Sequence, residues 1–255
     1  MKIIFFILIV STFLTVPSAT ASTYIYVDDD AYDLLLRLEA EGVIKSSLLT
    51  TRPSSRKEVM RLILEAERKY GESSIFIQGL IKSLKERFKV GAYDARFIKP
   101  VDFLYSRYVY ADSDIQALYY NNDGDLYGKG SNLRVGFSSM AELGWLSFYL
   151  NPEFRYSDND KDLIAKRAYG VLGFLGLEFT VGKDSQWWGP GYHGSILLSN
   201  NAEPMTMLRL TNPQPVLLPW IFKYLGLFRF TVFATRLEKE RDVPESYLWG
   251  MRFNF

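Results

Sequence analysis

An alternation of apolar and polar residues constrains this chain more than any other feature. It begins near residue 92 and is clearest over residues 145–156. One face of that run is apolar and carries Leu146, Phe148, Leu150, Phe154 and Tyr156. The other face is more polar and carries Ser147, Tyr149, Asn151, Glu153 and Arg155. Because successive side chains of a β-strand point to opposite faces, the run predicts a strand with one apolar and one wet face.

The same alternation recurs elsewhere in the second part of the chain. Further alternating runs occupy residues 133–143, 175–181, 228–235 and 247–255. Turn-forming sequences separate the runs at residues 121–125, 157–160 and 240–242. Together they give about eight candidate strands, each near the ~9–11 residues that a tilted membrane-spanning strand requires.

Two all-β folds suit such alternation: a soluble sandwich with one wet face, and a closed barrel in a membrane. In lipid, only a closed barrel satisfies every backbone hydrogen bond of a sheet. The aromatic content is 16%, with 17 Tyr and 18 Phe, as expected for the aromatic girdles of an outer-membrane barrel. We therefore expect a mainly β fold, with an antiparallel transmembrane β-barrel over residues 92–255. The soluble sandwich is the alternative.

The N-terminal residues have the order of a secretory signal. Lys2 gives a positive start, residues 3–16 form an apolar run, and Ala19-Thr20-Ala21 offers a small-x-small cleavage site before Ser22. The run is short for a membrane-spanning helix. We expect residues 1–21 to be a cleaved signal peptide and the chain to be exported. A membrane anchor or a buried N-terminal helix is the competing interpretation.

The remaining chain is electrically neutral and free of thiols. Residues 1–21 hold one of the 30 basic residues and none of the 29 acidic ones, so the two signs balance in the remainder. That balance gives no general attraction to nucleic acid. The absence of cysteine excludes disulfides, thiolate metal ligands and cysteine nucleophiles. We expect no cofactor and no metal.

A helical section is expected between the signal and the strands, over residues 22–91. Apolar residues recur at the helical period in three runs, at residues 30–42, 55–71 and 77–88. The residues from Asp28 to Asp30 are placed to cap the first helix. Ser55 and Glu58 have the spacing of a capping box at the start of the second. These helices predict a small periplasmic α-helical bundle that serves packing rather than chemistry.

The least ordinary stretch is residues 182–209, with the sequence GKDSQWWGPGYHGSILLSNNAEPMTMLR. A double Trp stands beside Gly-Pro-Gly, and Ser-Asn-Asn-Ala follows downstream. This stretch resembles the signature of the capsule assembly protein Wzi family. Further matching segments are residues 34–42, 51–54, 213–219, 225–226 and 248–252. The resemblance thus extends through the chain that follows the signal.

That resemblance implies an outer-membrane barrel linked to surface attachment of capsular polysaccharide. Barrels of that family are considerably larger than this chain allows. The chain is then either a truncated or split member, or a complete small barrel that ends on Phe255. We favour truncation, because residues 248–252 match the middle of the family pattern. Two sheet edges would then be exposed, and a missing C-terminal barrel segment would be needed to cover them.

Carbohydrate contact is the chemistry that the central motif suggests. Aromatic planes suit the C–H faces of sugars, and amide or guanidinium groups suit their hydroxyls. The candidate polysaccharide-binding or motif residues are Trp187, Trp188, Tyr192, His193, Asn200, Asn201 and Arg209. The competing interpretation is structural and takes precedence over sugar contact: the two Trp as interface anchors, and the Gly and Asn residues as a loop or plug.

Other chemistries have weaker support. His193 is the only histidine, and Asp184 and Ser185 lie near it in sequence, but no Gly-x-Ser-x-Gly elbow accompanies them. The turns at residues 123–125 and 158–160 lack the final Glu of a calcium loop, and we expect them to be solvated.

We therefore predict a non-enzymatic outer-membrane protein that acts in the assembly or surface attachment of capsular or exopolysaccharide. Its partners would be that polysaccharide and outer-membrane lipid. A porin-like channel is the alternative, with a lumen lined by Arg134, Glu142, Glu153 and Arg155. A hydrolase that uses His193 is a third, weaker hypothesis.

Overall fold

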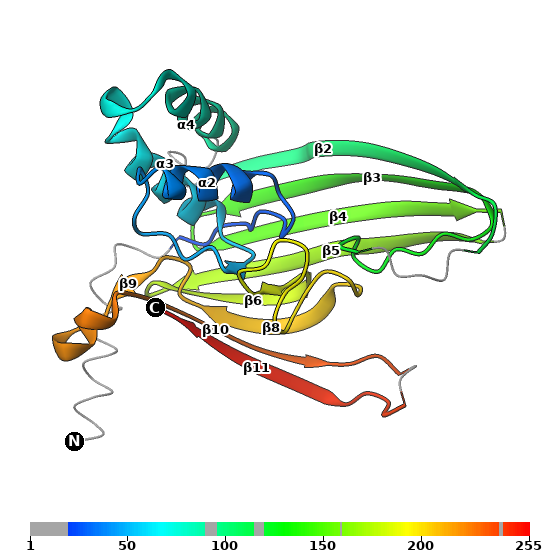
Figure 1. Cartoon of the computed structure of the whole chain (residues 1–255). Helices are drawn as coiled ribbons and strands as arrows, with labels where there is room; N and C mark the ends of the chain where they lie inside the picture. Colours follow the sequence, from blue (N-terminus) through cyan, green and yellow to red (C-terminus); the bar gives the residue numbers. More distant parts are fainter. Residues whose placement is uncertain (1–19, 90–95, 115–119, 159, 240–241) are drawn as a thin grey trace.

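The computed structural model describes residues 20–89, 96–114, 120–158, 160–239 and 242–255. The expected signal segment therefore lies outside the described residues, except for its last two positions. The expected boundary between residues 91 and 92 and parts of two expected turns, at Asn159 and at residues 240–241, also lie outside them. The described chain is mainly β: one antiparallel sheet curls into a half-barrel, with helices at one end (Figure 1).

In the described residues the main sheet has nine strands, and its strand order follows the order of the chain. Its eight long or medium strands are β2 (Arg96–Ala111), β3 (Gly130–Leu143), β4 (Leu146–Ser157), β5 (Lys161–Phe174), β6 (Leu177–Asp184), β8 (Met205–Thr211), β10 (Leu227–Arg236) and β11 (Tyr247–Asn254). Each pairs with the next in antiparallel register, and the short β9 (Val216–Leu217) pairs with β10. β2 and β11 form the two edges. A separate two-stranded sheet joins β1 (Thr51–Arg52) to β7 (Trp187–Trp188).

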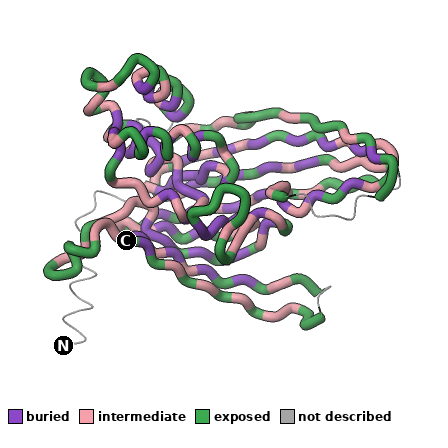
Figure 2. The backbone as a smooth tube through the Cα atoms, viewed as in Figure 1, coloured by how far each residue is buried: buried purple, intermediate pink, exposed green. Residues whose placement is uncertain are grey.

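Burial along the strands is the inverse of that in a water-soluble sheet. In β4, Ser147 and Glu153 on the concave face are buried. On the opposite face, Phe148, Leu150 and Phe154 expose 41–48% of their surface. Figure 2 shows this alternation of buried and exposed residues along the neighbouring strands. The soluble-sandwich interpretation is wrong, because it requires a second sheet on the apolar face, which is uncovered in the described structure.

The alternating runs all form strands, with small shifts at their ends. The run at residues 175–181 begins later than expected, because Leu175 adopts a φ of 49° in the turn before β6. Gly176, at a φ of 74°, completes this tight turn, since glycine tolerates a left-handed backbone. Eight strands pair consecutively from β2 to β11, and this confirms the expectation of about eight strands.

Within the described residues, three α-helices precede the sheet: α2 (Ala31–Ala40), α3 (Arg56–Glu67) and α4 (Ile75–Phe88). The Asp29 carboxylate caps α2 by accepting a hydrogen bond from the Ala31 amide at 2.8 Å. Ser55 caps α3 through its hydroxyl and the Glu58 amide, as the sequence predicts.

The expected end of the second helix at Gly71 is wrong. α3 ends at Glu67, and the amides of Arg68 and Lys69 donate hydrogen bonds to carbonyls of its last turn. The chain then forms a short 3-10 turn, η1 (Tyr70–Glu72), and Tyr70 is exposed there instead of packed. A second 3-10 segment, η2 (Trp220–Leu225), precedes β10.

The helices share one apolar core. It includes Leu35 and Leu38 of α2, Leu62 of α3, and Ile81 and Leu84 of α4, all of them buried. No helix in the described ranges is both long and apolar enough to cross a membrane.

The segment before α2 connects the helices to the sheet. Its Ala21 amide donates to the Gly144 carbonyl at 2.8 Å, and the Tyr24 amide donates to the Tyr169 hydroxyl at 2.9 Å. The Tyr24 ring packs 5.7 Å from the Tyr169 ring. This N-terminal segment, residues 20–27, therefore lies on the concave face of the half-barrel.

Candidate functional site

The two tryptophans of the central motif form a joint between the helical region and the sheet. Trp188 pairs with Thr51 and Trp187 with Arg52 in the small sheet, and both indoles are buried. The Trp188 ring meets the Phe233 ring edge-on, with centroids 5.3 Å apart. Because protein atoms cover both rings, neither ring lies at a lipid interface or offers an open face to a sugar in this structure.

Tyr192 and His193 lie in an exposed loop beside α2. The Tyr192 hydroxyl donates to the Asp33 carboxylate at 2.9 Å, and its ring lies edge-on to the His193 ring at 4.9 Å. These contacts place the loop against the helical region, and they leave the His193 imidazole at the surface.

The three residues considered for hydrolysis, Asp184, Ser185 and His193, have separate partners. Asp184 lies 3.5 Å from the Arg209 guanidinium, and the Ser185 hydroxyl donates to Asp123 at 2.8 Å. His193 contacts Tyr192 instead. The chain therefore does not assemble a nucleophile and a base at this place.

Asn200 and Asn201 join two loops that are far apart in sequence. The Asn200 carbonyl accepts from the Asp123 amide at 2.8 Å, and its side-chain amide donates to the Tyr26 hydroxyl at 3.0 Å. The Asn201 side-chain oxygen accepts from the Asn121 amide at 2.8 Å. Both asparagines thus fold the loop at residues 121–125 onto the concave face.

Arg209 holds the N-terminal segment from below. Its guanidinium lies 4.1 Å from the centre of the Tyr24 ring, and it is almost fully buried. The motif residues are therefore distributed over a joint, a surface loop and the floor of the half-barrel, and the structure does not gather them into one pocket.

The expectation of solvated turns at residues 123–125 is wrong. Asp123 and Asp125 are buried and ion-paired: Asp123 with Lys166 at 3.3 Å, and Asp125 with Arg134 at 3.1 Å. The loop turns inward because Lys166, Arg134 and Arg155 of the concave face carry positive charge. These charges offset the cost of burying the two carboxylates. Asp158 behaves as expected and stays exposed at its turn.

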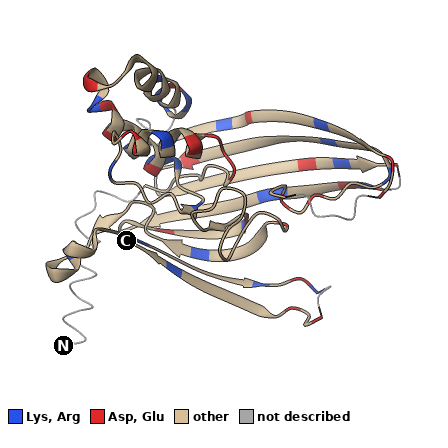
Figure 3. Cartoon of the chain, in the orientation of Figure 1, with Lys and Arg blue, Asp and Glu red and all other residues tan. Residues whose placement is uncertain are grey.

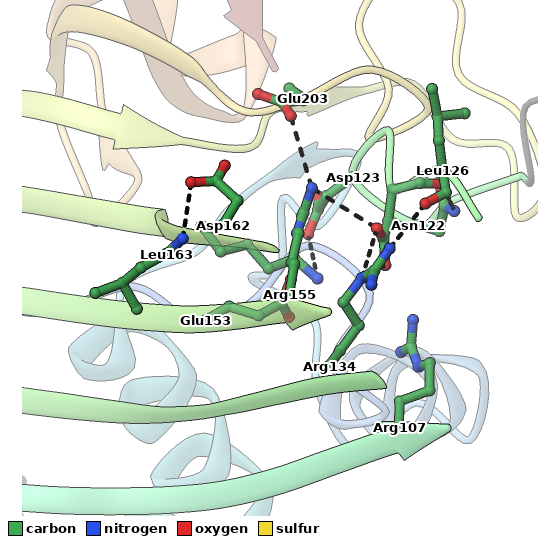
Figure 4. Close-up of polar contacts among 12 residues, drawn as sticks. Arg107, Asn122, Asp123, Leu126, Arg134, Glu153, Arg155, Asp162, Leu163 and Glu203 are labelled. Atoms are coloured by element: carbon green, nitrogen blue, oxygen red, sulfur yellow. Dashed lines mark hydrogen bonds and ion pairs between the residues drawn. The ribbon is translucent and has the colours of Figure 1, made fainter. Parts of the chain in front are cut away.

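These ion pairs belong to a polar network along the concave face (Figure 4). The Arg134 and Arg155 side chains converge from β3 and β4. Arg155 donates to Glu153 at 2.8 Å and lies 3.9 Å from Glu203. Beside this network is a cavity of about 220 Å³ that Arg134, Arg155, Asp160 and Asp162 help to line. Figure 3 shows basic residues on several adjacent strands of this sheet.

A larger cavity of about 650 Å³ lies between the helical region and β2 to β5. Three of its basic side chains have acidic partners: Arg87 pairs with Asp29, Lys99 with Asp102, and Lys166 with Asp123. Three others, Arg56, Arg107 and Arg167, have no carboxylate within 4.0 Å among the residues that the structure places. The lining therefore carries an excess of positive charge.

Aromatic groups lie close to these three arginines. The Arg167 guanidinium lies between the Tyr26 ring at 4.4 Å and the Tyr149 ring at 4.9 Å. It also donates to the Tyr149 hydroxyl at 2.9 Å. Arg107 donates to the Tyr127 hydroxyl at 3.1 Å. Two guanidinium nitrogens of Arg56 and one of Arg167 are buried without a hydrogen-bond partner in the described structure.

Two ionisable groups of the N-terminal part have raised pKa values. Burial raises the pKa of the Tyr26 hydroxyl far above its usual range, and the nearby Asp123 carboxylate raises it further. Tyr26 thus stays neutral and donates to Asp123 at 2.9 Å. Burial also raises the pKa of Asp29. The hydrogen bond from the Ala31 amide and the charge of Arg87 act in the opposite direction and lower it.

The arrangement suits binding better than bond cleavage. Guanidinium groups and tyrosine hydroxyls donate hydrogen bonds, and the tyrosine rings give flat surfaces for C–H groups. Within the described ranges, no group of three or more His, Cys, Asp or Glu residues is placed to hold a metal ion. Sequence reasoning missed this cavity because its arginines come from four separate elements, although the wet face of β4 pointed towards it.

Comparisons with known proteins agree with the resemblance of the central motif. The family model described as capsule assembly protein Wzi matches residues 110–255. An uncharacterized 55.8 kDa protein in the cps region of Klebsiella pneumoniae is 26% identical over 243 residues, which are 93% of this chain and 44% of that protein. The chain thus spans less than half the length of this relative. No solved structure matches the chain significantly.

The family match begins in β2 and includes every later strand of the sheet. It also includes the loop at residues 121–125 and the motif at residues 182–209, which contribute Asp123, Asp125 and Glu203 to the polar network. Because the match covers more than half of the chain, the protein belongs to the capsule assembly protein Wzi family.

Proposed function

We propose that this chain acts, without catalysing a reaction, in the assembly or attachment of capsular or exopolysaccharide at the surface of a Gram-negative-type cell. Its family is named for capsule assembly, and its relative from Klebsiella pneumoniae is described as a protein in the cps region. In this proposal, residues 1–21 are the export signal, the helices lie in the periplasm, and the strands form part of an outer-membrane barrel.

The inverted burial of the sheet supports the membrane placement. Large apolar side chains such as Phe148, Val181, Leu208 and Trp249 remain 48–66% exposed on the convex face. Soluble monomers rarely expose contiguous apolar patches of more than a few hundred Å². Exposing such a surface to water costs free energy, whereas covering it with lipid tails does not.

The open edges support a larger assembly. β2 and β11 lie at opposite ends of the sheet, and each pairs with one neighbour in the described structure. Unpaired backbone groups in lipid cost several kcal/mol each, so a membrane barrel must be closed. We propose that a further strand segment completes the barrel between β2 and β11.

The observation that carries the sugar-binding role is the cavity lined by Arg56, Arg107 and Arg167. It combines guanidinium groups that have no carboxylate partner in the described structure with the Tyr26 and Tyr149 rings, and saccharides, as polar and flat ligands, require such groups. No specific observation favours the porin-like alternative. The N-terminal segment lies across the concave face, and Arg134 and Arg155 are held in ion pairs.

The role can be tested by deleting the gene and restoring it with the full chain or with variants. We expect deletion to release polysaccharide from the cells into the medium, and the wild-type gene to restore retention. The double variant Arg107→Gln and Arg167→Gln should restore less retention, because it removes both charges from the cavity. Arg236→Gln is a matched control, since Arg236 lies at an exposed strand end and pairs with Glu245.

Unchanged surface polysaccharide after deletion would reject the proposal. A steady single-channel current from the purified protein in planar bilayers would instead favour the porin-like alternative.

A further inference from the structure

Two buried glutamates lie beneath the N-terminal segment. Glu142 of β3 and Glu178 of β6 are each 2% exposed. Glu142 accepts hydrogen bonds from the Ser22 hydroxyl at 2.9 Å and from the Thr23 amide at 2.8 Å. Glu178 accepts from the Ser22 amide nitrogen at 3.1 Å and from the Tyr24 hydroxyl. Both carboxylates are therefore directed at the same short segment, residues 22–24.

Among the residues that the structure describes, neither glutamate has a cationic side chain as a direct partner. No lysine or arginine nitrogen lies within 4.0 Å of either carboxylate in the described ranges. Two cationic side chains whose charges act on Glu178 have other direct partners: Arg209 lies 3.5 Å from Asp184, and the Lys57 ammonium donates to the Ala21 carbonyl at 3.0 Å. A buried carboxylate without a counter-charge is costly, so the pair calls for a positive group at this place.

The Ser22 nitrogen occupies the position that such a group would take. It lies 3.1 Å from a Glu178 oxygen, and the Ser22 side chain bridges to Glu142. The small-x-small sequence Ala19-Thr20-Ala21 ends immediately before it. Hydrolysis of the Ala21–Ser22 bond would turn this amide nitrogen into an ammonium without moving it.

We propose that export cleavage before Ser22 creates an α-ammonium group that becomes the buried counter-ion of Glu142 and Glu178 and fastens the N-terminus to the concave face. This inference rests on the export that the proposed function includes. An export peptidase adds one water molecule: Ala21 leaves as a carboxylate that takes the water oxygen, and the Ser22 nitrogen keeps its one hydrogen and gains both hydrogens of the water. One bond breaks, and no oxidant is involved.

Cleavage also rearranges the surroundings of the new N-terminus. The hydrogen bond from the Ala21 amide to the Gly144 carbonyl is lost, and Lys57 loses the Ala21 carbonyl as its acceptor. Burial lowers the pKa of Lys57, whereas the charges of Glu142 and Glu178 raise it. After cleavage, two positive groups face two negative ones, and the charges balance.

The first test determines the N-terminus of the full chain recovered from the outer membrane. Intact mass and N-terminal sequencing should give Ser22 as the first residue. A mature chain that begins at Thr20, or one that keeps residues 1–21, would overturn the proposal, because the Ser22 nitrogen would remain an amide.

The second test measures the accessibility of the new amine. The folded protein is treated near neutral pH with an N-hydroxysuccinimide ester of acetate, and acylation of the N-terminal peptide is followed by mass spectrometry. Because an ion pair holds the amine in its unreactive charged form, we expect acylation about tenfold slower than in the unfolded chain. The variant Glu142→Gln with Glu178→Gln should lose this protection, and either single variant should lose part of it.

Glu153→Gln is the matched control, since Glu153 is an equally buried glutamate that pairs with Arg155 and not with the N-terminal segment. Equal acylation rates in wild type and in the double variant would contradict the ion pair.

A third variant separates position from charge. A glycine inserted between Ala21 and Ser22 leaves the cleavage sequence intact but moves the amine one residue away. It should become reactive although both glutamates remain. These readouts do not depend on capsule: normal protection in a protein that retains no polysaccharide would reject the proposed function alone, and lost protection with normal retention would reject this inference alone.

Discussion

At the residue scale, the central motif shows what composition can and cannot predict. The residues from Trp187 to Arg209 identify the family from sequence alone. The types of side chain also suggest sugar contact, but both indoles are buried where β7 pairs with β1. Burial of a side chain depends on partners such as Phe233, which lies 45 residues further along the chain, and no local pattern reports such a distant contact.

Replacement of Trp188 tests this structural role. Trp188→Ala should destabilise the folded protein by about 3–5 kcal/mol, the usual cost of emptying a large buried aromatic site. Urea unfolding in detergent micelles measures the change. Tyr192→Ala, at an exposed loop position, should cost far less. Equal losses for both variants would contradict the placement of the two side chains.

Asp125 is a second residue whose role the sequence did not reveal. Its position in an Asn-Asp-Gly turn predicts solvation, yet it neutralises Arg134 and lies 3.7 Å from Arg155. Asp125→Ala should cost about 3–5 kcal/mol, because it leaves the buried Arg134 guanidinium without its carboxylate partner. The same urea titration measures this cost, with the exposed Asp158→Ala as control. A loss below 1 kcal/mol for Asp125→Ala would indicate that the loop is solvated after all.

At the scale of elements, periodicity predicted the type of each helix and strand better than its ends. The capping box located the start of α3, because Ser55 and Glu58 act within one turn. The end of α3 at Glu67 was missed, since the apolar spacing continues to Tyr70 while the backbone tightens into a 3-10 turn. In β4, Pro152 lies at a shift in register, which explains how a proline fits inside a strand.

Helix α3 also carries a pH-dependent contribution to stability. Burial raises the pKa of Glu58 above its usual 4.5, although Arg61 opposes the shift by a hydrogen bond and an ion pair. The folded state therefore binds this proton more tightly than the unfolded chain does. The contribution is present at low pH and is lost as pH rises from 4.5 through the folded pKa.

We expect the free energy of unfolding of wild type to fall, relative to that of Glu58→Gln, as pH rises through this range. Urea titrations of both proteins at a series of pH values measure the difference. A difference that stays constant, or that grows in favour of wild type, would contradict the direction of the shift.

At the scale of the whole molecule, the alternation predicted the sheet, its antiparallel order and the faces of its strands. It did not predict the larger cavity, because Arg56, Arg107 and Arg167 meet only when α3, β2 and β5 are folded together. Nor did it show that the N-terminal segment would lie across the concave face. Both features arise from contacts between segments that are distant in sequence, to which periodicity is blind.

The inverted burial pattern of this sheet is also the basis of the proposed membrane placement. A water-soluble protein of this shape would expose Glu153 and bury Phe148, whereas this chain does the reverse. If lipid covers the convex face, side chains along one strand must alternate between lipid and the polar interior at every second residue.

The most direct measurement uses spin labels along β4. The chain has no cysteine, so single cysteines can be introduced one at a time at residues 146–154 without a background signal. With the protein in lipid bilayers, we predict that collision with dissolved oxygen peaks at positions 148, 150 and 154 and falls at 147, 151 and 153. A chain that stays folded in water without lipid, and whose labels at 148 and 150 collide freely with a water-soluble nickel complex, would contradict the account.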